Sequence, residues 1–150
     1  MRRKSFDTAP CPVARSLDVI GDWWSLLIIR DALNGLKRFG EFERSLGMAK
    51  NILTARLKAM VAQGVMEVIP ASDGSAYQEY NLTEKGRALL PVLTALGQWG
   101  DNFLFTPGEP RSVSIDIKKR RPLRRIDVRA EDGRHLDAKD ITFRSVGEVR

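Results

Sequence analysis

The chain has 150 residues, of which 43% are hydrophobic and 29% are charged, as in a soluble globular protein. This length allows one domain with a full core, and no apolar run is long enough to span a membrane. The single cysteine excludes an internal disulfide framework and a metal site of several thiolates. No apolar stretch follows the basic N-terminal residues, so we expect no signal peptide and a cytoplasmic protein without cofactor or membrane partner.

The net charge of +6 is unevenly distributed. Residues 1–110 carry 13 Lys and Arg against 12 Asp and Glu, whereas residues 111–150 carry 12 against 7. Most of the excess lies in Lys118–Arg125, whose sequence is KKRRPLRR. The segment Lys37–Lys58 is also locally basic, with six cations against two carboxylates. Such segments suit a polyanionic partner, although bulk charge alone does not identify one.

The first predicted helix begins at Pro12, because proline suits the first helical position and leaves Cys11 at the cap. Gly21 ends it. Residues 1–10 are polar, and we expect them to fray. The apolar positions of this helix follow at helical spacing: Val13, Leu17 and Ile20.

A second helix is predicted over Trp23–Leu33, with Asp22 as its N-cap and Asn34 at its end. It is apolar nearly all round, so we expect it to be the most buried element. Trp23 and Trp24 are expected in the core or at an interface, with a ligand-pocket wall as the alternative.

The stretch Lys37–Gln63 predicts a helix-turn-helix. A helix over Phe39–Leu46 is followed by Gly47, which supplies a tight turn, and by a second helix from about Ala49. The second helix has an apolar stripe formed by Leu53, Leu57, Met60 and Val61, with Ala49 beside it. Its opposite face combines hydrogen-bonding side chains with small alanines: Asn51, Thr54, Ala55, Lys58 and Ala62.

Two strand-like runs follow, Val65–Ile69 and Tyr77–Leu82, separated by the turn-rich loop PASDGSA. Two helices and then a hairpin is the order of a winged helix. In that fold the second helix enters the major groove and the hairpin reaches the DNA backbone beside it. The predicted fold class is therefore mainly α with a small β-hairpin.

After the hairpin, Thr83 caps a helix that runs through LLPVLTALGQWGDNFL, and Pro91 is expected to kink it or to break it in two. Its apolar stripe is too wide for packing on one small domain, which favours burial against a second subunit. The alternative is that the C-terminal tail covers it. The predicted dimer interface comprises Val13, Leu17, Leu93, Leu96, Trp99 and Phe103.

The predicted domains are residues 1–106, the winged helix, and residues 107–150, a basic extension. Alternating apolar residues and the turn signal Glu131–Gly133 predict a small β-rich tail. His135 has no second histidine or cysteine near it, so we expect a surface side chain and no metal.

Three segments resemble the HxlR-type winged helix-turn-helix transcription regulators of bacteria, within the MarR-like superfamily. They are CPVARSLDVIGDWWSLLIIRDAL, RFGEFERSLGMAKNILTARLKAM and YNLTEKGRALLPVLTALGQWG, within residues 9–105. The tail sequence VRAEDGRHLDAKDI also looks like the extension of longer members. The resemblance implies a homodimer that binds double-stranded DNA at a palindromic operator.

The start of the recognition helix departs from the family pattern of a Ser-like cap, Pro and Lys. Ala49, Lys50 and Asn51 stand at those places. The missing cap costs roughly 1 kcal/mol, and the base-reading chemistry differs from the common pattern.

Several polar side chains are candidates for DNA contact. In a major groove Asn51 can pair with an adenine edge, and Lys50 or Lys58 can reach guanine or phosphate. Thr54 can donate a hydrogen bond to either or touch a thymine methyl. The alternative is a solvated helix face. Arg56, at the border of the two faces, suits a phosphate or an intraprotein contact, and Asp73 opposes phosphate binding by the wing. The remaining predicted DNA contacts are Lys37, Arg38, Ser72, Ser75 and Tyr77.

Cys11 matches the N-terminal cysteine that in some HxlR-type regulators senses oxidants or electrophiles such as quinones. A thiol at a helix N-terminus lies at the positive end of the helix dipole, which favours the reactive thiolate, and Arg15 adds to this. The sensor hypothesis therefore has a small oxidant or electrophile as effector. The alternative is a small buried residue at a dimer contact.

Two other classes of function are weighed against DNA binding. A winged-helix module that binds protein through its Trp- and Leu-rich helix is compatible with the fold order. An enzyme with Cys11 as nucleophile is disfavoured, because the one histidine lies in the tail and the sequence has no nucleotide or metal motif.

Overall fold

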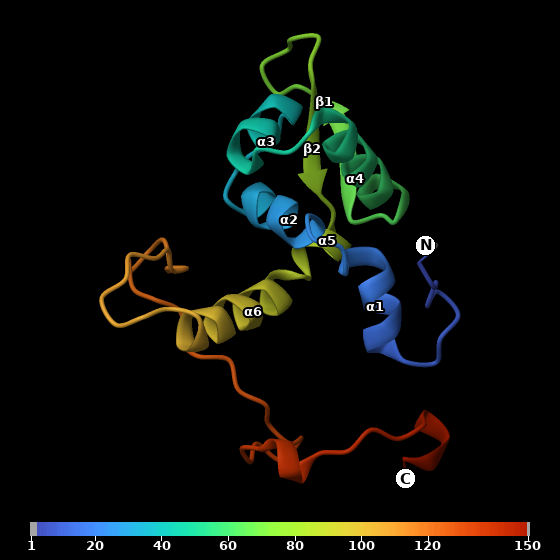
Figure 1. Ribbon diagram of the computed structural model, residues 1–150, viewed down its shortest axis with the longest axis vertical. Helices are drawn as coiled ribbons and strands as arrows, with labels where there is room; N and C mark the ends of the chain where they lie inside the picture. The colour runs from blue at the N-terminus through green and yellow to red at the C-terminus, as the bar shows by residue number, and fades with distance from the viewer. Residues whose placement is uncertain (1–2, 150) are drawn as a thin grey trace. The chain divides into compact units, whose positions relative to one another are not determined.

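The computed structural model describes residues 3–149 and divides the chain into two compact units, residues 1–93 and 94–150 (Figure 1). The division falls inside α6, whereas the sequence predicts a domain boundary after residue 106. None of the described helices is long and apolar enough to cross a membrane. The elements in chain order are α1 (Pro12–Ile20), α2 (Ser25–Leu33), α3 (Phe39–Leu46), α4 (Lys50–Ala62), β1 (Met66–Pro70), β2 (Gln78–Leu82), α5 (Glu84–Arg87), α6 (Leu90–Phe103), η1 (Ala138–Asp140) and η2 (Val146–Glu148).

The first helix has the predicted ends, because Cys11 is the extended N-cap residue, proline is at the first position and Gly21 is the C-cap. The segment before α1 does not fray as expected. Its Ser5 hydroxyl and Phe6 amide donate to Asp18 Oδ2 at 2.9 and 2.8 Å, and Arg3 donates to the Leu17 carbonyl at 3.1 Å. These hydrogen bonds fasten the segment to α1. Residues 1 and 2 lie outside the described part of the chain.

The second helix begins at Ser25, two residues later than predicted. Asp22 accepts the backbone amides of Trp24 and Ser25 at 3.1 and 3.0 Å, and also the Ser25 hydroxyl, so the turn is closed by its carboxylate. Trp23 is 83% exposed, so of its two predicted places, core or interface, the core of the single chain is excluded. Trp24 is partly buried and packs against the core.

The helix-turn-helix matches the prediction closely. α3 begins and ends at the predicted residues, and Gly47 adopts the left-handed conformation (φ 62°) that lets the chain turn into α4. The fourth helix, α4, begins at Lys50 and follows Ala49, whose side chain cannot cap it. Its apolar stripe enters the core, which is formed by Ile20, Ile28, Ile29, Phe42, Met48, Leu53, Leu57, Met60, Val65, Met66 and Leu82.

The wing is an antiparallel hairpin in which Met66 pairs with Leu82 and Pro70 with Gln78. The loop between its strands projects beyond α3 and α4 (Figure 1). The amide of Tyr80 donates to the Lys37 carbonyl at 2.7 Å, which ties β2 to the connection between α2 and α3. The hairpin is therefore positioned by both the core and the backbone that leads into α3.

The helix after the hairpin is broken in two, as the proline predicted. Thr83 caps α5 by accepting the Gly86 amide at 3.2 Å. The chain then leaves the helix and starts α6 at Leu90, so that Pro91 occupies the first turn, where its missing N–H is not needed.

Beyond α6, the second unit has little regular structure. Its predicted β-rich character is limited to two isolated bridges, Ile115 with Pro122 and Arg129 with His135, and the predicted turn is present at Gly133 (φ 90°). The extension is held to α6 by Gln98, which donates to the Arg124 carbonyl at 3.0 Å and accepts the Ile126 amide at 2.7 Å. Between residues 104 and 149, two residues are partly buried and the rest are exposed.

Candidate nucleic-acid interface

The fourth helix has the two faces that the sequence predicted. Leu53, Leu57 and Met60 are buried, with exposed fractions of 1% or less. All five residues of the opposite face are exposed: Asn51, Thr54, Ala55, Lys58 and Ala62. A helix anchored by one stripe and exposing amide, hydroxyl and ammonium groups beside alanines can lie close to base edges in a major groove.

The side chains at the start of α4 are free to meet a partner. Lys50 and Asn51 are exposed and form no side-chain hydrogen bond or ion pair within residues 3–149. Thr54 donates its hydroxyl proton to the Lys50 carbonyl at 2.8 Å, so in this conformation it meets a base with its lone pairs and its methyl group. Asn51 is then the one side chain of this turn that offers both a donor and an acceptor.

Arg56 makes an intraprotein contact. Its Nη1 lies 3.5 Å from Asp22 Oδ1, so the pair joins α4 to the turn that begins α2. Partial burial raises the pKa of Asp22, but the hydrogen bonds from Ser25 and Trp24 and the charge of Arg56 outweigh it and lower that pKa. The pair is therefore ionised at neutral pH and braces the recognition helix against α2.

Arg38 connects the start of α3 with the wing. Its Nη2 donates to Asp73 Oδ2 at 2.5 Å, and its guanidinium lies over the Tyr77 ring, 5.3 Å from the ring centroid. Hydrogen bonds from the Ser75 amide and hydroxyl and from Arg38 lower the pKa of Asp73 to about 2. From the sequence we expected Asp73 to oppose phosphate binding by the wing. Its ion pair with Arg38 could not be predicted, because 35 residues separate the two side chains.

The wing loop is also held from inside by Glu79, which is 2% exposed. Its carboxylate accepts the Ser72 amide at 2.5 Å and the Ser72 hydroxyl at 2.8 Å. These two hydrogen bonds, the amide first, lower the pKa of Glu79, with smaller contributions from Lys37 and Arg38. Ser72 therefore shapes the loop, while the Tyr77 side chain is 68% exposed and open to a DNA backbone.

A buried carboxylate that the sequence did not single out lies beneath α3. Asp31 is 5% exposed, accepts the Ser45 hydroxyl at 2.6 Å and pairs with Arg30 at 3.0 Å. The contact holds α2 and α3 together. No local pattern marks it, since Ser45 lies 14 residues further along the chain.

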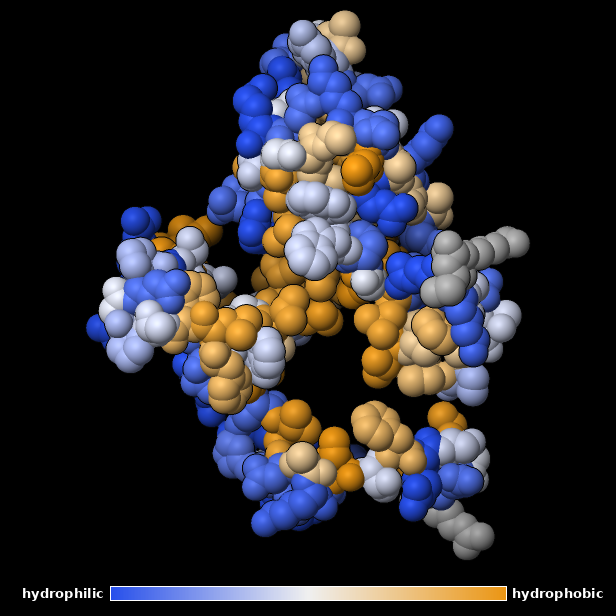
Figure 2. Space-filling view, viewed as in Figure 1, coloured by the Kyte–Doolittle hydropathy of each residue, from blue (hydrophilic) through white to orange (hydrophobic). Residues whose placement is uncertain are grey.

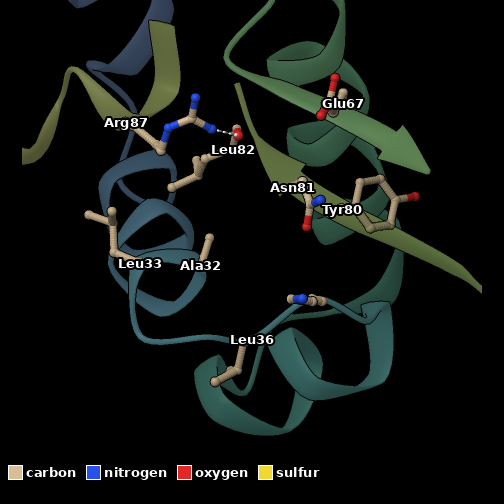
Figure 3. Close-up of a pocket in the computed structure, with 9 residues that line it drawn as sticks. Ala32, Leu33, Leu36, Glu67, Tyr80, Asn81, Leu82 and Arg87 are labelled. Carbon is tan, nitrogen blue, oxygen red and sulfur yellow. Dashed lines mark hydrogen bonds between the residues drawn. The ribbon is translucent and has the colours of Figure 1, made fainter. Parts of the chain in front are cut away.

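A hollow of about 310 Å³ lies beside the hairpin in the first unit (Figure 3). Figure 3 shows Leu33 and Ala32 of α2 on one side and Tyr80 and Asn81 of β2 on the other, with Arg87 donating to the Leu82 carbonyl at 2.8 Å. Lys37 is the single predicted DNA contact that lines it. The base-reading candidates on α4 thus lie outside this hollow.

The side chains predicted for a dimer interface are largely exposed in the single chain. Figure 2 shows apolar side chains gathered over α6 and α1. Leu93 is partly buried, and the others are exposed by 47–66%: Val13, Leu17, Leu96, Trp99 and Phe103. Cys11 is exposed at the start of α1, and Arg15 donates to the Ala9 carbonyl at 2.6 Å rather than to the thiol.

Known proteins share this arrangement of elements. The family model of the HxlR-like helix-turn-helix matches residues 19–107. Rv3095 of Mycobacterium tuberculosis, named an HTH-type transcriptional regulator, is 41% identical over 98 residues, which cover 65% of this chain and 62% of the relative. The chain thus spans less than two thirds of that relative's length.

Two solved structures extend the comparison. PA1607, assigned provisionally as a transcription factor, is 53% identical, with a TM-score of 0.89 over 94% of this chain and 99% of that chain. The redox regulator HypR in its reduced form is 33% identical, with a TM-score of 0.57 over 61% of this chain and 92% of that chain. The chain belongs to the HxlR-like helix-turn-helix family, and the relatives that it matches are named transcriptional regulators.

Proposed function

We propose that this protein binds a palindromic operator sequence-specifically as a homodimer. The observation that carries the proposal is the exposed polar face of α4, with Asn51, Thr54 and Lys58 on one side of a helix whose other side is buried. A winged helix places this helix in the major groove, where an Asn side chain can bond adenine N6 and N7 together. Lys50 and Lys58 add guanine or phosphate contacts.

The wing and the start of α3 supply backbone contacts in this proposal. Lys37 and Tyr77 are exposed and available for phosphates, whereas Arg38 reaches a phosphate only by exchanging its Asp73 partner. Ser72 and Ser75 hold the loop that carries Tyr77. The wing loop itself carries no Lys or Arg, and the Arg38 guanidinium is already paired with the Asp73 carboxylate. The wing therefore adds less affinity than α4, and Arg56 acts mainly through its pair with Asp22.

The homodimer rests on the apolar side chains of α1 and α6. Leu17, Leu96 and Trp99 each leave about half of their surface in water in the single chain, a cost that a partner subunit would remove. One winged helix covers one half-site, so a twofold pair matches a palindrome. The competing function, a protein-binding module, predicts no preference for any duplex.

Asn51→Ala is expected to weaken operator binding by roughly 1–3 kcal/mol and to relax specificity at one base position, because the alanine loses the bidentate contact. The measurement is a mobility shift on operator and on scrambled duplex, with the operator first selected from genomic fragments. Asn102→Ala, on the exposed surface of α6, is the control and should leave both affinities unchanged. Equal losses on the two duplexes would remove Asn51 from base reading, and equal wild-type affinity for both would favour the protein-binding module.

We also propose that modification of Cys11 releases the operator. Cys11 is exposed at the N-cap of α1, and α1 carries the proposed dimer residues Val13 and Leu17. The similarity to HypR, solved in reduced and in oxidised forms, supports this proposal. A single cysteine allows a sulfenic acid, a mixed disulfide, a quinone adduct or a bond to the same residue of the partner.

Cys11→Ser is expected to keep operator affinity and to lose its response to diamide or a quinone, whereas the wild type should release DNA on treatment. Operator affinity is measured for both proteins before and after treatment, with the modified fraction read by mass spectrometry. Restoration of binding by dithiothreitol after diamide is the control for reversibility. A wild type that holds its DNA while Cys11 is fully modified would make the cysteine structural.

A further inference from the structure

The second unit presents four consecutive cations at the tip of a tight turn. The turn, which we name the basic turn, comprises Lys118–Arg121. The Arg120 amide donates to the Asp116 carbonyl at 2.8 Å, and the Asp116 amide donates to the Arg121 carbonyl at 2.9 Å. The Asp116 carboxylate accepts the amides of Lys118 and Lys119 at 2.9 and 3.3 Å. The backbone of the basic turn is thus fixed locally, with its side chains directed away from any core.

Two carboxylates of the second unit, Asp101 and Asp127, are paired with cations outside the basic turn. Asp101 pairs with Arg111 and Arg125, and Asp127 pairs with Arg129. In the part of the chain that the structure describes, the four side chains of the basic turn form no ion pair and no side-chain hydrogen bond, and all four are exposed. Four like charges therefore stand together without an ion-pair partner, and the nearby Asp116 carboxylate is engaged by the backbone amides of Lys118 and Lys119.

The conformation of the basic turn is also costly. Arg120 has φ 58°, in the left-handed region, and among the described residues it is the one non-glycine residue with a positive φ. For a residue with a Cβ this conformation costs roughly 1–2 kcal/mol. Because residues 104–149 bury almost no side chain, packing does not account for the strain or for the charge repulsion.

We propose that the basic turn binds the phosphate backbone of duplex DNA and adds affinity that does not depend on base sequence. This rests on the proposed DNA-binding function and extends it to the C-terminal extension. Lysine and arginine at a turn tip make point contacts to phosphates, which position a protein without reading bases. The turn has no aromatic side chain on which single-stranded bases could stack, so the chemistry suits a duplex rather than single-stranded RNA.

The test compares two double variants of the full chain that lose the same charge. Lys118→Gln with Lys119→Gln removes half of the basic turn and spares the strained Arg120. Lys139→Gln with Arg144→Gln removes two exposed cations elsewhere in the same unit. Affinity for a fluorescent duplex of random sequence is measured from 50 to 200 mM KCl, and circular dichroism checks that both variants are folded.

Each phosphate contact contributes about 0.9 to the slope of log affinity against log salt, so the first variant should lower the magnitude of that slope by about 1.8. The second variant should match the wild type. Equal slopes for all three proteins would overturn the proposal, as would a loss of affinity for single-stranded RNA with an unchanged duplex slope. Because the duplex carries no operator, this result is independent of sequence-specific binding, which the Asn51→Ala experiment tests separately.

Discussion

Leu96→Glu is expected to make the protein monomeric and to abolish operator binding at the same time. Leu96 lies midway along α6 and is 52% exposed in the single chain. Burying a leucine against a partner contributes about 1.5–3 kcal/mol, and a glutamate at the same place would bury a carboxylate without a partner. In a twofold dimer each substitution acts twice, so the interface loses several kcal/mol.

The two properties are measured together, by sedimentation at micromolar concentration and by mobility shift on the operator. Asn102→Glu, an exposed position on the same helix and away from the apolar stripe, is the matched control and should remain a dimer that binds DNA. A folded Leu96→Glu monomer with full operator affinity would refute the proposed link between assembly and binding. A Leu96→Glu dimer would place the interface elsewhere.

Gly86→Ala is expected to destabilise the winged helix strongly. Gly86 is buried in α5, and a Cβ there would overlap the Val65 carbonyl oxygen and lie 3.0 Å from Leu82 Cδ2. That carbonyl accepts the Thr83 amide at 3.1 Å, so moving it would break the contact that joins α5 to the hairpin. We expect a loss of about 3 kcal/mol, which lowers the melting temperature by roughly 10 °C in a chain of this size.

Gly97→Ala is the matched control, because it adds the same methyl group to a helical glycine with no heavy atom within 4 Å of the new Cβ. Alanine favours a helix over glycine by up to about 1 kcal/mol, so this variant should melt at the same or a higher temperature. Thermal denaturation followed by circular dichroism gives both values. Equal melting temperatures for the two variants would show that the close approach of α5 to the hairpin is not needed for stability.

The order of the elements and the two faces of α4 could be predicted from the sequence. Local signals were enough for this, because caps, proline, glycine and apolar spacing act within a few residues. Pro12 and Gly21 predicted the two ends of α1, Gly47 predicted the turn between α3 and α4, and Pro91 predicted the break before α6. The three motifs predicted the winged helix, and the spacing of Leu53, Leu57 and Met60 predicted which face of α4 is left for DNA.

Which polar and charged side chains pair with one another could not be predicted from the sequence and follows from the tertiary structure. Arg38 pairs with Asp73, Arg56 pairs with Asp22, and Ser45 donates to the buried Asp31. Each contact joins residues at least 14 positions apart, and no periodicity relates the partners.

The same limit applies to exposure. Trp23 is exposed in the single chain although the neighbouring residues are apolar, because it lies in the turn closed by Asp22 and precedes the first residue of α2. The four cations of the basic turn were visible in the sequence, but the sequence did not show that they form no ion pair in the described part of the chain. Pairing is decided by distance in space, which a single sequence does not contain.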